Sequence, residues 1–408
     1  MKHLLLYLLL FLSFRHAGAT TFSIAPGNDI NTVINRSAAG DTILFLPGTH
    51  ATRGIVVDHP LFLIGKGNAT LDGQGKYEII TVRSDNVIIE GLHLFHSGYS
   101  SINDLAGIHI YNARNVLVRN NSFTNNYFAI YLQHVSHSVI MNNKLESDAA
   151  NEIESGNGIH CWKSDSLVIA GNSITGHRDG IYFEFVTASN IINNKSFGNI
   201  RYGLHFMFSH NDLYVNNTFS NNGAGVAIMY TKHVRMYKNK FINNWGNAAY
   251  GILMKDISDS HAEGNEFNRN TAAIYMEGSS RIMITRNRFT NNGYAMKIQA
   301  SCDNNNIVNN NFQGNSFDVA TNGSLVLNYF TNNFWDKYEG YDLDRDGKGD
   351  VPYRPTSLFT ILVERNASAM MLLRSPITSL VEKAEKILPV FTPESMKDNA
   401  PLMKPLPL

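Results

Sequence analysis

His205, Met207 and Met229 carry the side chains in this sequence that are best suited to hold a soft metal ion. His205 and Met207 are two residues apart, and Met229 follows Met207 by one period of a repeat of roughly 22 residues. Because imidazole and thioether ligands together favour Cu(I), one interpretation of these exposed side chains is a Cu(I) site, with His160 as a weaker further ligand. The alternative is an apolar patch on which a protein docks.

Aromatic residues gather around this candidate metal site. Contiguous exposed aromatic side chains are typical of interaction surfaces, whereas a solvated sheet face more usually carries Thr, Lys, Glu and Ser. We therefore expect a partner protein to contact the chain beside the Cu(I) site, through Tyr182, Phe185, Phe206 and Phe208.

An enzymatic interpretation of the same region is also open. His160, Tyr182 and Glu184 fall on neighbouring copies of the repeat, where they could supply a general base, a general acid and a charge neutraliser. Such a trio suits elimination or epimerisation of a uronate, as in a polysaccharide lyase or epimerase. Glycoside hydrolysis is disfavoured, because its two carboxylates must flank one bond, and Glu184 and Glu277 would lie about 19 Å apart.

A calcium-loop pattern of alternating aspartates appears late in the chain. Asp342, Asp344 and Asp346 alternate before a glycine, and Asp350 lies further on. Alternate carboxylates converge on a hard cation, and glycine permits the sharp turn that this requires. The twelfth position, which is Glu in an EF-hand loop, is Tyr353 here. We expect these four aspartates to bind a structural Ca(II), with a plain acidic turn as the alternative.

The repeat itself supplies the elements that position these residues. Each copy opens with a small residue and alternating apolar residues, and it closes with Asn-x-Phe or a close variant. This periodicity predicts strands, and the unit is too short for two packed helices. We predict an all-β fold, a right-handed parallel β-helix with an internal asparagine ladder beside stacked Phe rings. The copy closing Asn194-Lys195-Ser196-Phe197 is expected to be one residue longer.

One residue of each opening should face away from the core. In successive copies it is His109, Tyr131, His160, Tyr182 and His205. Alternate turns lie about 9.6 Å apart, so the three histidines cannot form one tight site and at most line a path. Two copies are stretched by insertions, after Leu145 and after Phe241, and we expect these insertions to be loops on one edge of the solenoid.

Three segments are predicted: a signal peptide over 1–19, the β-helix over 20–334, and a C-terminal region over 335–408. Lys2 and His3 precede an apolar run that ends at Leu12, and a small-residue segment follows, which is the layout of a secretory signal peptide. The segment from Asp29 to Ala38 has the apolar spacing of a short helix that caps the solenoid.

The sequence of the C-terminal region predicts an acidic loop, a helix and an extended tail. Ser375 begins the helical pattern, which ends at Pro389. The Pro-rich segment over 392–408 cannot fold alone, and we expect it to lie on a partner or on the solenoid, with Met403 as a contact residue.

Composition excludes one class of partner. Lys plus Arg and Asp plus Glu are both 34, and charged residues make up 17% of the chain, against about 25% in an average domain. Without a basic field, the chain is not expected to bind nucleic acid.

Several motifs outside the generic repeat are shared with one known family. They are Arg178-Asp179-Gly180-Ile181-Tyr182-Phe183, Arg201-Tyr202-Gly203-Leu204-His205-Phe206-Met207, Asn244-Trp245-Gly246, Ala249-Tyr250-Gly251, Phe334-Trp335-Asp336, Gly340-Tyr341-Asp342, the run from Asp346 to Tyr353, and Pro401-Leu402-Met403-Lys404-Pro405. Through these motifs, and over essentially its full length, the chain resembles the NosD family of periplasmic nitrous-oxide-reductase maturation proteins. The resemblance implies a non-enzymatic periplasmic β-helix that works with an ABC transporter and a copper chaperone to deliver copper to apo nitrous oxide reductase. It also implies that the tail engages the membrane subunit of the transporter.

Overall fold

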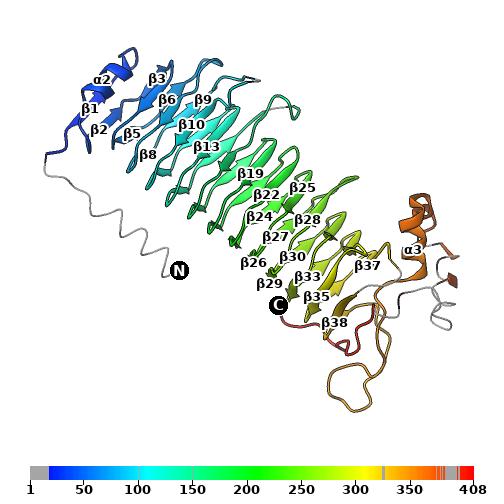
Figure 1. The fold of residues 1–408 in the computed structure, drawn as a ribbon. Coiled ribbons are helices and arrows are strands. Elements are labelled where there is room, and N and C mark those ends of the chain that lie inside the picture. The colour runs from blue at the N-terminus through cyan, green and yellow to red at the C-terminus, as the bar shows by residue number, and fades with distance from the viewer. Residues whose placement is uncertain are drawn as a thin grey trace.

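The computed structural model forms an all-β, right-handed parallel solenoid of about 13 turns, as predicted (Figure 1). It describes residues 18–100, 102–148, 150–323, 327–373, 375–376, 378, 380–381, 393 and 396–408. The predicted signal peptide therefore lies almost wholly outside the described residues. Each regular turn adds one strand to each of three parallel sheets, which we name sheets A, B and C.

The strands of each sheet follow one another in chain order along the solenoid axis. Sheet A contains β1 (Thr21–Ile24), β2 (Thr42–Phe45), β5 (Phe62–Gly65), β8 (Ile88–Glu90), β11 (Leu117–Arg119), β14 (Val139–Met141), β17 (Val168–Ala170), β20 (Asn190–Ile192), β23 (Leu213–Val215), β26 (Arg235–Tyr237), β29 (His261–Glu263), β32 (Met283–Thr285), β35 (Asp303–Val308) and β38 (Leu327–Thr331). Sheet B contains β3 (Gly48–Ala51), β6 (Ala69–Asp72), β9 (His93–Phe95), β12 (Ser122–Thr124), β15 (Lys144–Glu146), β18 (Ser173–Thr175), β21 (Lys195–Phe197), β24 (Thr218–Ser220), β27 (Lys240–Ile242), β30 (Glu266–Asn268), β33 (Arg288–Thr290), β36 (Asn311–Gln313) and β39 (Phe334–Trp335). Sheet C contains β4 (Ile55–Val57), β7 (Ile80–Val82), β10 (Ala106–Tyr111), β13 (Phe128–Gln133), β16 (Ile159–Trp162), β19 (Asp179–Glu184), β22 (Tyr202–Met207), β25 (Ala224–Met229), β28 (Tyr250–Lys255), β31 (Ala272–Glu277), β34 (Tyr294–Ile298) and β37 (Phe317–Ala320).

The predicted asparagine ladder runs through the interior. Each Nδ2 donates to Oδ1 of the asparagine one turn later, at 2.9 to 3.1 Å, so every buried amide has partners above and below. Stacked Phe rings lie beside the ladder, and the indole of Trp335 continues the stack 4.1 Å from Phe312. The ladder consists of Asn121, Asn143, Asn172, Asn194, Asn217, Asn239, Asn265, Asn287, Asn310 and Asn333.

A second ladder of buried asparagines, which the sequence analysis did not anticipate, follows sheet B. Its members are Asn199, Asn222, Asn244, Asn270, Asn292 and Asn315, and each side-chain oxygen accepts a hydrogen bond from the turn before. The copy at Asn194 is one residue longer, as expected, because Ile181 pairs with Leu204 at a spacing of 23 residues. The extra residue does not lie in β21, which keeps register with both neighbours: Ser196 takes the inward place of Phe219, and Phe197 faces outward.

Both ends of the solenoid are covered. At the N-terminal end the predicted capping helix is α2 (Ile30–Arg36), with Asp29 as its N-cap, and its Ile30 and Ile34 are buried in the core. At the other end, α3 (Leu358–Arg365) and the 3-10 helix η2 (Ala367–Leu372) follow the last strands, and α3 packs on β37 (Figure 1). α3 was not expected from the sequence. Most of the helix predicted from Ser375 to Pro389 lies outside the described residues.

The two predicted insertions lie on one edge of the solenoid. Residues 147–158 connect β15 to β16, and residues 243–249 connect β27 to β28, so both loops lie where sheet B passes into sheet C. Both therefore border the outward face of sheet C. No helix within the described part of the chain is long and apolar enough to span a membrane.

Candidate functional site

A column of five aromatic and imidazole rings stands on the outward face of sheet C. In register from β10 to β22 its members are His109, Tyr131, His160, Tyr182 and His205. Successive ring centroids are 4.4, 4.5, 4.8 and 4.9 Å apart, which confirms the predicted alternation. The rings cover one another so closely that only 6% of His205 is exposed. The expectation of an exposed histidine at this position is therefore wrong.

Met207 and Met229 are directly paired on β22 and β25. Both are partly exposed, and His205 lies on the same strand and face as Met207. The hydroxyl of Tyr182 donates to Sδ of Met207 at 3.5 Å, and burial raises the pKa of Tyr182 to about 12, so the hydroxyl stays protonated. Opposite His205 the next strand has only Ala227, where the column of rings ends. The structure thus brings the three predicted soft donors together on two neighbouring strands.

Asp179 and Arg201 form an ion pair beside His205 that the sequence analysis missed. Asp179 is fully buried, and the guanidinium of Arg201 donates to both carboxylate oxygens, at 3.0 and 2.7 Å. Nδ1 of His205 lies 3.6 Å from Oδ2 of Asp179. Burial alone would raise the pKa of Asp179, but the nearby His205 and Arg201 outweigh burial and lower it, so a negative charge persists beside the imidazole.

His160 has a different environment from His205. The side-chain amide of Asn157 lies 3.2 Å from Nδ1 of His160, while the oxygen of the same amide accepts from Arg178 at 3.3 Å. Burial and the charge of Arg178 lower the pKa of His160 to about 3, so the ring is neutral at ordinary pH. The structure places His160 two turns from His205, with Tyr182 between them, so His160 does not join the three soft donors.

Three exposed aromatic rings lie along one edge of sheet C, beside Met207 and Met229. Phe185 and Phe208 stack with centroids 5.2 Å apart, and Tyr230 stacks on Phe208 at 5.0 Å. Their exposed fractions are 44%, 37% and 40%, and all three have positive φ. A bulky residue in this conformation is uncommon and strained. We call these three residues the aromatic edge; Tyr230 was missed, although it lies one repeat after Phe208.

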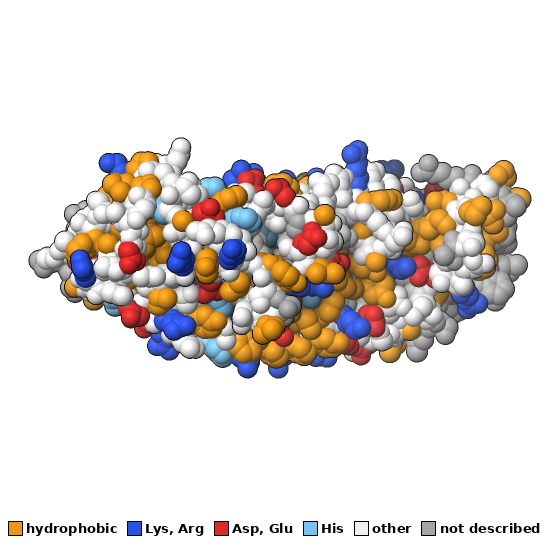
Figure 2. All heavy atoms as spheres, turned by 90° about the horizontal axis from the view of Figure 1, so that it is seen from above, with side chains coloured by type: hydrophobic (Ala, Val, Ile, Leu, Met, Phe, Trp, Pro, Cys, Tyr) orange, Lys and Arg blue, Asp and Glu red, His pale blue; other side chains and the backbone are white. Residues whose placement is uncertain are grey.

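Phe206 does not belong to this surface, and its prediction as a partner contact is wrong. Its side chain is fully buried in the core and stacks on Tyr214 at 4.6 Å. Strand alternation explains this position, because Phe206 points the same way as the inward Leu204. On the face that Figure 2 shows, hydrophobic side chains lie in patches along the solenoid, with histidines and charged groups among them.

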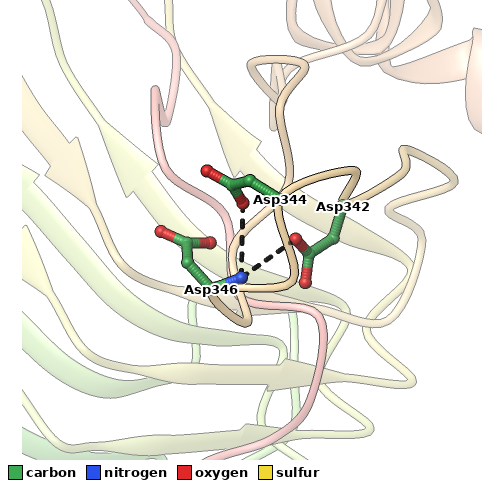
Figure 3. Close-up of side chains that lie close together, drawn as sticks. All are labelled: Asp342, Asp344 and Asp346. Carbon is green, nitrogen blue, oxygen red and sulfur yellow. Dashed lines mark hydrogen bonds between the residues drawn. The ribbon is translucent and has the colours of Figure 1, made fainter.

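The structure brings three of the four predicted calcium ligands together. One carboxylate oxygen from each of Asp342, Asp344 and Asp346 lies within 4.8 Å of the others (Figure 3). The backbone amide of Asp346 donates to Asp342 and Asp344, at 3.2 and 3.3 Å. Asp350 is not part of the cluster, since its carboxylate accepts from the amide of Leu343 at 2.7 Å. Such an arrangement of oxygens suits a hard cation such as Ca(II).

The end of the tail lies on the solenoid, which is one of the two places expected for it. Met403 is half-buried, and its backbone amide donates to Gly347 in the acidic loop at 3.0 Å. Gly349 in turn donates to the carbonyl of Pro401 at 2.8 Å, so the loop holds the tail from one side. Further on, Asn311 and Leu406 exchange two hydrogen bonds.

Stacked turns, an internal asparagine ladder and an outward face of rings and thioethers define a parallel β-helix protein with a soft-donor surface. A family model described as periplasmic copper-binding protein (NosD) matches residues 146–340, and one described as right handed beta helix region matches residues 67–155. A Pseudomonas aeruginosa relative named "Probable ABC transporter binding protein NosD" is 28% identical, over 90% of this chain and 89% of its own. A Stutzerimonas stutzeri relative with the same name is 24% identical, over 88% and 86%. Over most of its length the chain is similar to the NosD family.

Solved structures share the fold. A family 28 exopolygalacturonase from Yersinia enterocolitica matches 77% of this chain and 78% of its own, with a TM-score of 0.56 and 10% identity. A double mutant of the periplasmic alginate epimerase AlgG matches 72% of this chain and 77% of its own, with a TM-score of 0.52 and 13% identity. At such identities the likeness concerns architecture and carries no inference about activity.

Proposed function

We propose that this protein is a non-enzymatic accessory in the maturation of nitrous oxide reductase, which binds Cu(I) transiently through His205, Met207 and Met229. In this proposal a copper chaperone supplies the ion, an ABC transporter works with the protein in the periplasm, and apo nitrous oxide reductase receives the copper. The family description as periplasmic copper-binding and the naming of both relatives as ABC transporter binding proteins support it.

The pairing of Met207 with Met229 is the observation that carries the copper assignment. Two thioethers on neighbouring strands lie about 5 Å apart at their backbones, with an imidazole on the same face. Soft ligands of this kind favour Cu(I) over the hard cations, which prefer oxygen. Three neutral ligands at a partly open surface suit an ion that must be released again, whereas a closed cage of thiolates would retain it.

A Cu(I) titration of the purified protein against a chromogenic chelator tests this assignment. Met207→Leu combined with Met229→Leu conserves volume while removing both sulfur atoms, so the fold should persist and the affinity should fall. Met283→Leu is the matched control, since Met283 is 38% exposed on sheet A, away from the proposed ligands. The proposal fails if the double variant keeps both the Cu(I) affinity of the wild type and full copper loading of the reductase.

The aromatic edge gives the partner a place to bind next to the copper. Phe185, Phe208 and Tyr230 directly follow Glu184, Met207 and Met229 in the chain, so a protein seated on the rings would also reach the thioethers. Exposed aromatic side chains are enriched at the energetic centres of interfaces. We assign this surface, together with Tyr182, to the copper chaperone or the reductase.

The C-terminal tail is our candidate contact for the membrane subunit of the transporter. Lys404 and Pro405 are exposed at the end of the solenoid, next to the half-buried Met403. The same region holds the aspartate cluster, to which we assign a structural Ca(II) that would hold the loop against the tail. Loss of transporter capture in a chain that ends before Met403 but still binds Cu(I) would support this contact.

The alternative, a lyase or epimerase acting on a uronate polysaccharide, finds less support. A general base must reach the proton that it abstracts, yet Nε2 of His160 is buried and its Nδ1 faces Asn157. Glu184 is next to Met207 on sheet C rather than beside a second exposed carboxylate. Incubation with alginate or pectin separates the two functions, because only an enzyme would produce unsaturated or epimerised sugars.

A further inference from the structure

Asp179 is a fully buried carboxylate on the outward face of a sheet, where charged side chains are ordinarily solvated. Its charge is compensated by the two hydrogen bonds from Arg201, which is itself anchored over the ring of Tyr202 at 5.0 Å. A buried ion pair of this kind carries a desolvation cost and is weak evidence for stability. The remaining neighbour of this carboxylate is His205.

The carboxylate determines which nitrogen of His205 holds the proton. Oδ2 of Asp179 faces Nδ1 at 3.6 Å, the distance of an ion pair rather than of a hydrogen bond. A negative charge on that side favours a proton on Nδ1, which leaves the lone pair on Nε2. Nε2 is buried and has no hydrogen-bond partner among the residues that the structure describes. An unpaired buried nitrogen with a free lone pair is poised to bind a ligand.

The other two histidines of the column lack this combination. Asn157 donates to Nδ1 of His160, because its oxygen is already turned to Arg178, and this places the proton of His160 on Nε2. His109 does have an acidic partner, Glu78, at 2.8 Å from Nδ1. Its neighbours on the outward face, however, are Tyr111, Gln133 and Tyr131, so no thioether stands beside it.

We propose that Asp179, held by Arg201, is a positioning residue that fixes the Nδ1-protonated form of His205 and so makes His205, rather than His160, the imidazole ligand of Cu(I). This inference rests on the copper function proposed above. The arrangement of carboxylate, histidine and metal recurs widely at metal sites, where the carboxylate orients the ring and strengthens its donor nitrogen.

The tautomer can be measured without copper. In protein labelled with 15N-histidine, the chemical shifts of the two ring nitrogens of His205 should show Nδ1–H in the wild type. Asp179→Asn keeps the shape of the side chain but removes its charge, and it should shift the population toward Nε2–H. The inference is overturned if wild-type His205 already carries its proton on Nε2, whether or not the protein binds Cu(I).

Copper affinity gives the second readout. Asp179→Asn should weaken Cu(I) binding by about 10- to 100-fold, the usual cost of losing a carboxylate behind a histidine ligand. Glu78→Gln is the matched control, since it changes the partner of His109 and should leave the affinity unchanged. If Asp179→Asn fails to fold because Arg201 loses its partner, the double change Asp179→Asn with Arg201→Gln removes the unpaired cation.

The outcomes separate the two proposals. A wild-type protein that does not bind Cu(I) overturns the copper function, while the nitrogen shifts of His205 still report on Asp179. A wild-type protein that binds Cu(I) equally well after Asp179→Asn keeps the copper function and overturns the role of Asp179.

Discussion

The carboxylate of Asp398 ends the asparagine ladder at Asn333. Its Oδ2 accepts from both the backbone amide and the side-chain amide of Asn333, each at 3.0 Å. The same oxygen accepts from the indole of Trp335 at 3.1 Å, and Asp398 is fully buried. In each turn from Asn121 to Asn310 the corresponding backbone and side-chain amides donate to the next asparagine, so a residue 65 positions further along the chain closes the ladder. The tail thus caps the open end of the solenoid.

Asp398→Ala should destabilise this end of the solenoid. Three buried donors would lose their acceptor, which we expect to cost about 3 kcal/mol in the free energy of unfolding. Urea denaturation measures the loss, and hydrogen exchange should show lost protection in β38 and β39. Asp398→Asn is the control, because its side-chain oxygen restores the acceptor. Equal stability of wild type and Asp398→Ala would contradict the capping role.

His177 should make the protein less stable in acid. It occupies the position before Asn199 in the second asparagine ladder, and burial lowers the pKa of His177 to about 4. As pH falls from about 6.5 to about 4, the unfolded chain takes up a proton there that the folded chain refuses, so the free energy of unfolding falls by about 1.4 kcal/mol per pH unit, about 3 kcal/mol in all.

Replacing His177 with Asn would continue the ladder and remove this titration. We expect His177→Asn to reduce the slope of unfolding free energy against pH by about 1.4 kcal/mol per pH unit across that window, as measured by urea melts at pH 7, 5.5 and 4.5. The slope that remains comes in part from His160, whose pKa burial also lowers. His137→Asn controls for the removal of an exposed histidine. An identical pH dependence in wild type and His177→Asn would show that this ring is not the source of the acid sensitivity.

The aromatic edge should matter for binding more than for folding. Phe208 has φ of 50°, and the equivalent position of a later turn is Gly278, with φ of 57°. Glycine accepts this conformation without strain, so Phe208→Gly should leave thermal stability within about 1 kcal/mol of wild type. The combination of Phe208→Gly with Tyr230→Gly should weaken capture of the copper chaperone or apo reductase.

Tyr329 offers the control for this surface, since it is 60% exposed on sheet A. Tyr329→Ala should not change capture of either partner. If the two glycine substitutions leave binding by both partners intact, while the fold is preserved, the aromatic edge is not their docking surface.

The acidic loop should respond to Ca(II) and not to Mg(II). The cluster of Asp342, Asp344 and Asp346 suits flexible oxygen coordination, with a dissociation constant on the order of 10⁻⁴ to 10⁻³ M for an extracellular site. Calorimetry should detect binding that Asp344→Asn weakens. Hydrogen exchange should show that Ca(II) protects the amides of Gly349 and Met403, which join the loop to the tail. Absence of both effects at millimolar Ca(II) would leave a plain acidic turn.

The sequence by itself determined the scaffold. Alternating apolar residues and a closing Asn-x-Phe specify parallel strands, because inward amides and rings stabilise a turn only when they stack on the same residues of the next turn. The register of His205 with Tyr182, and of Met207 with Met229, follows directly from that repetition. The candidate metal donors could therefore be predicted from their positions in the repeat.

Only the tertiary structure decided which other residues contact these metal donors and how deeply the donors are buried. The repeat gives the direction of each side chain and its register partner in the next turn, but not the contacts between positions that are out of register. Neither the approach of Asp179 to His205 nor the burial of His205 could therefore be predicted from spacing. The closure of the ladder by Asp398 depends on a tail that folds back across the last turn. Such contacts arise from packing between segments far apart in the chain, which local periodicity does not encode.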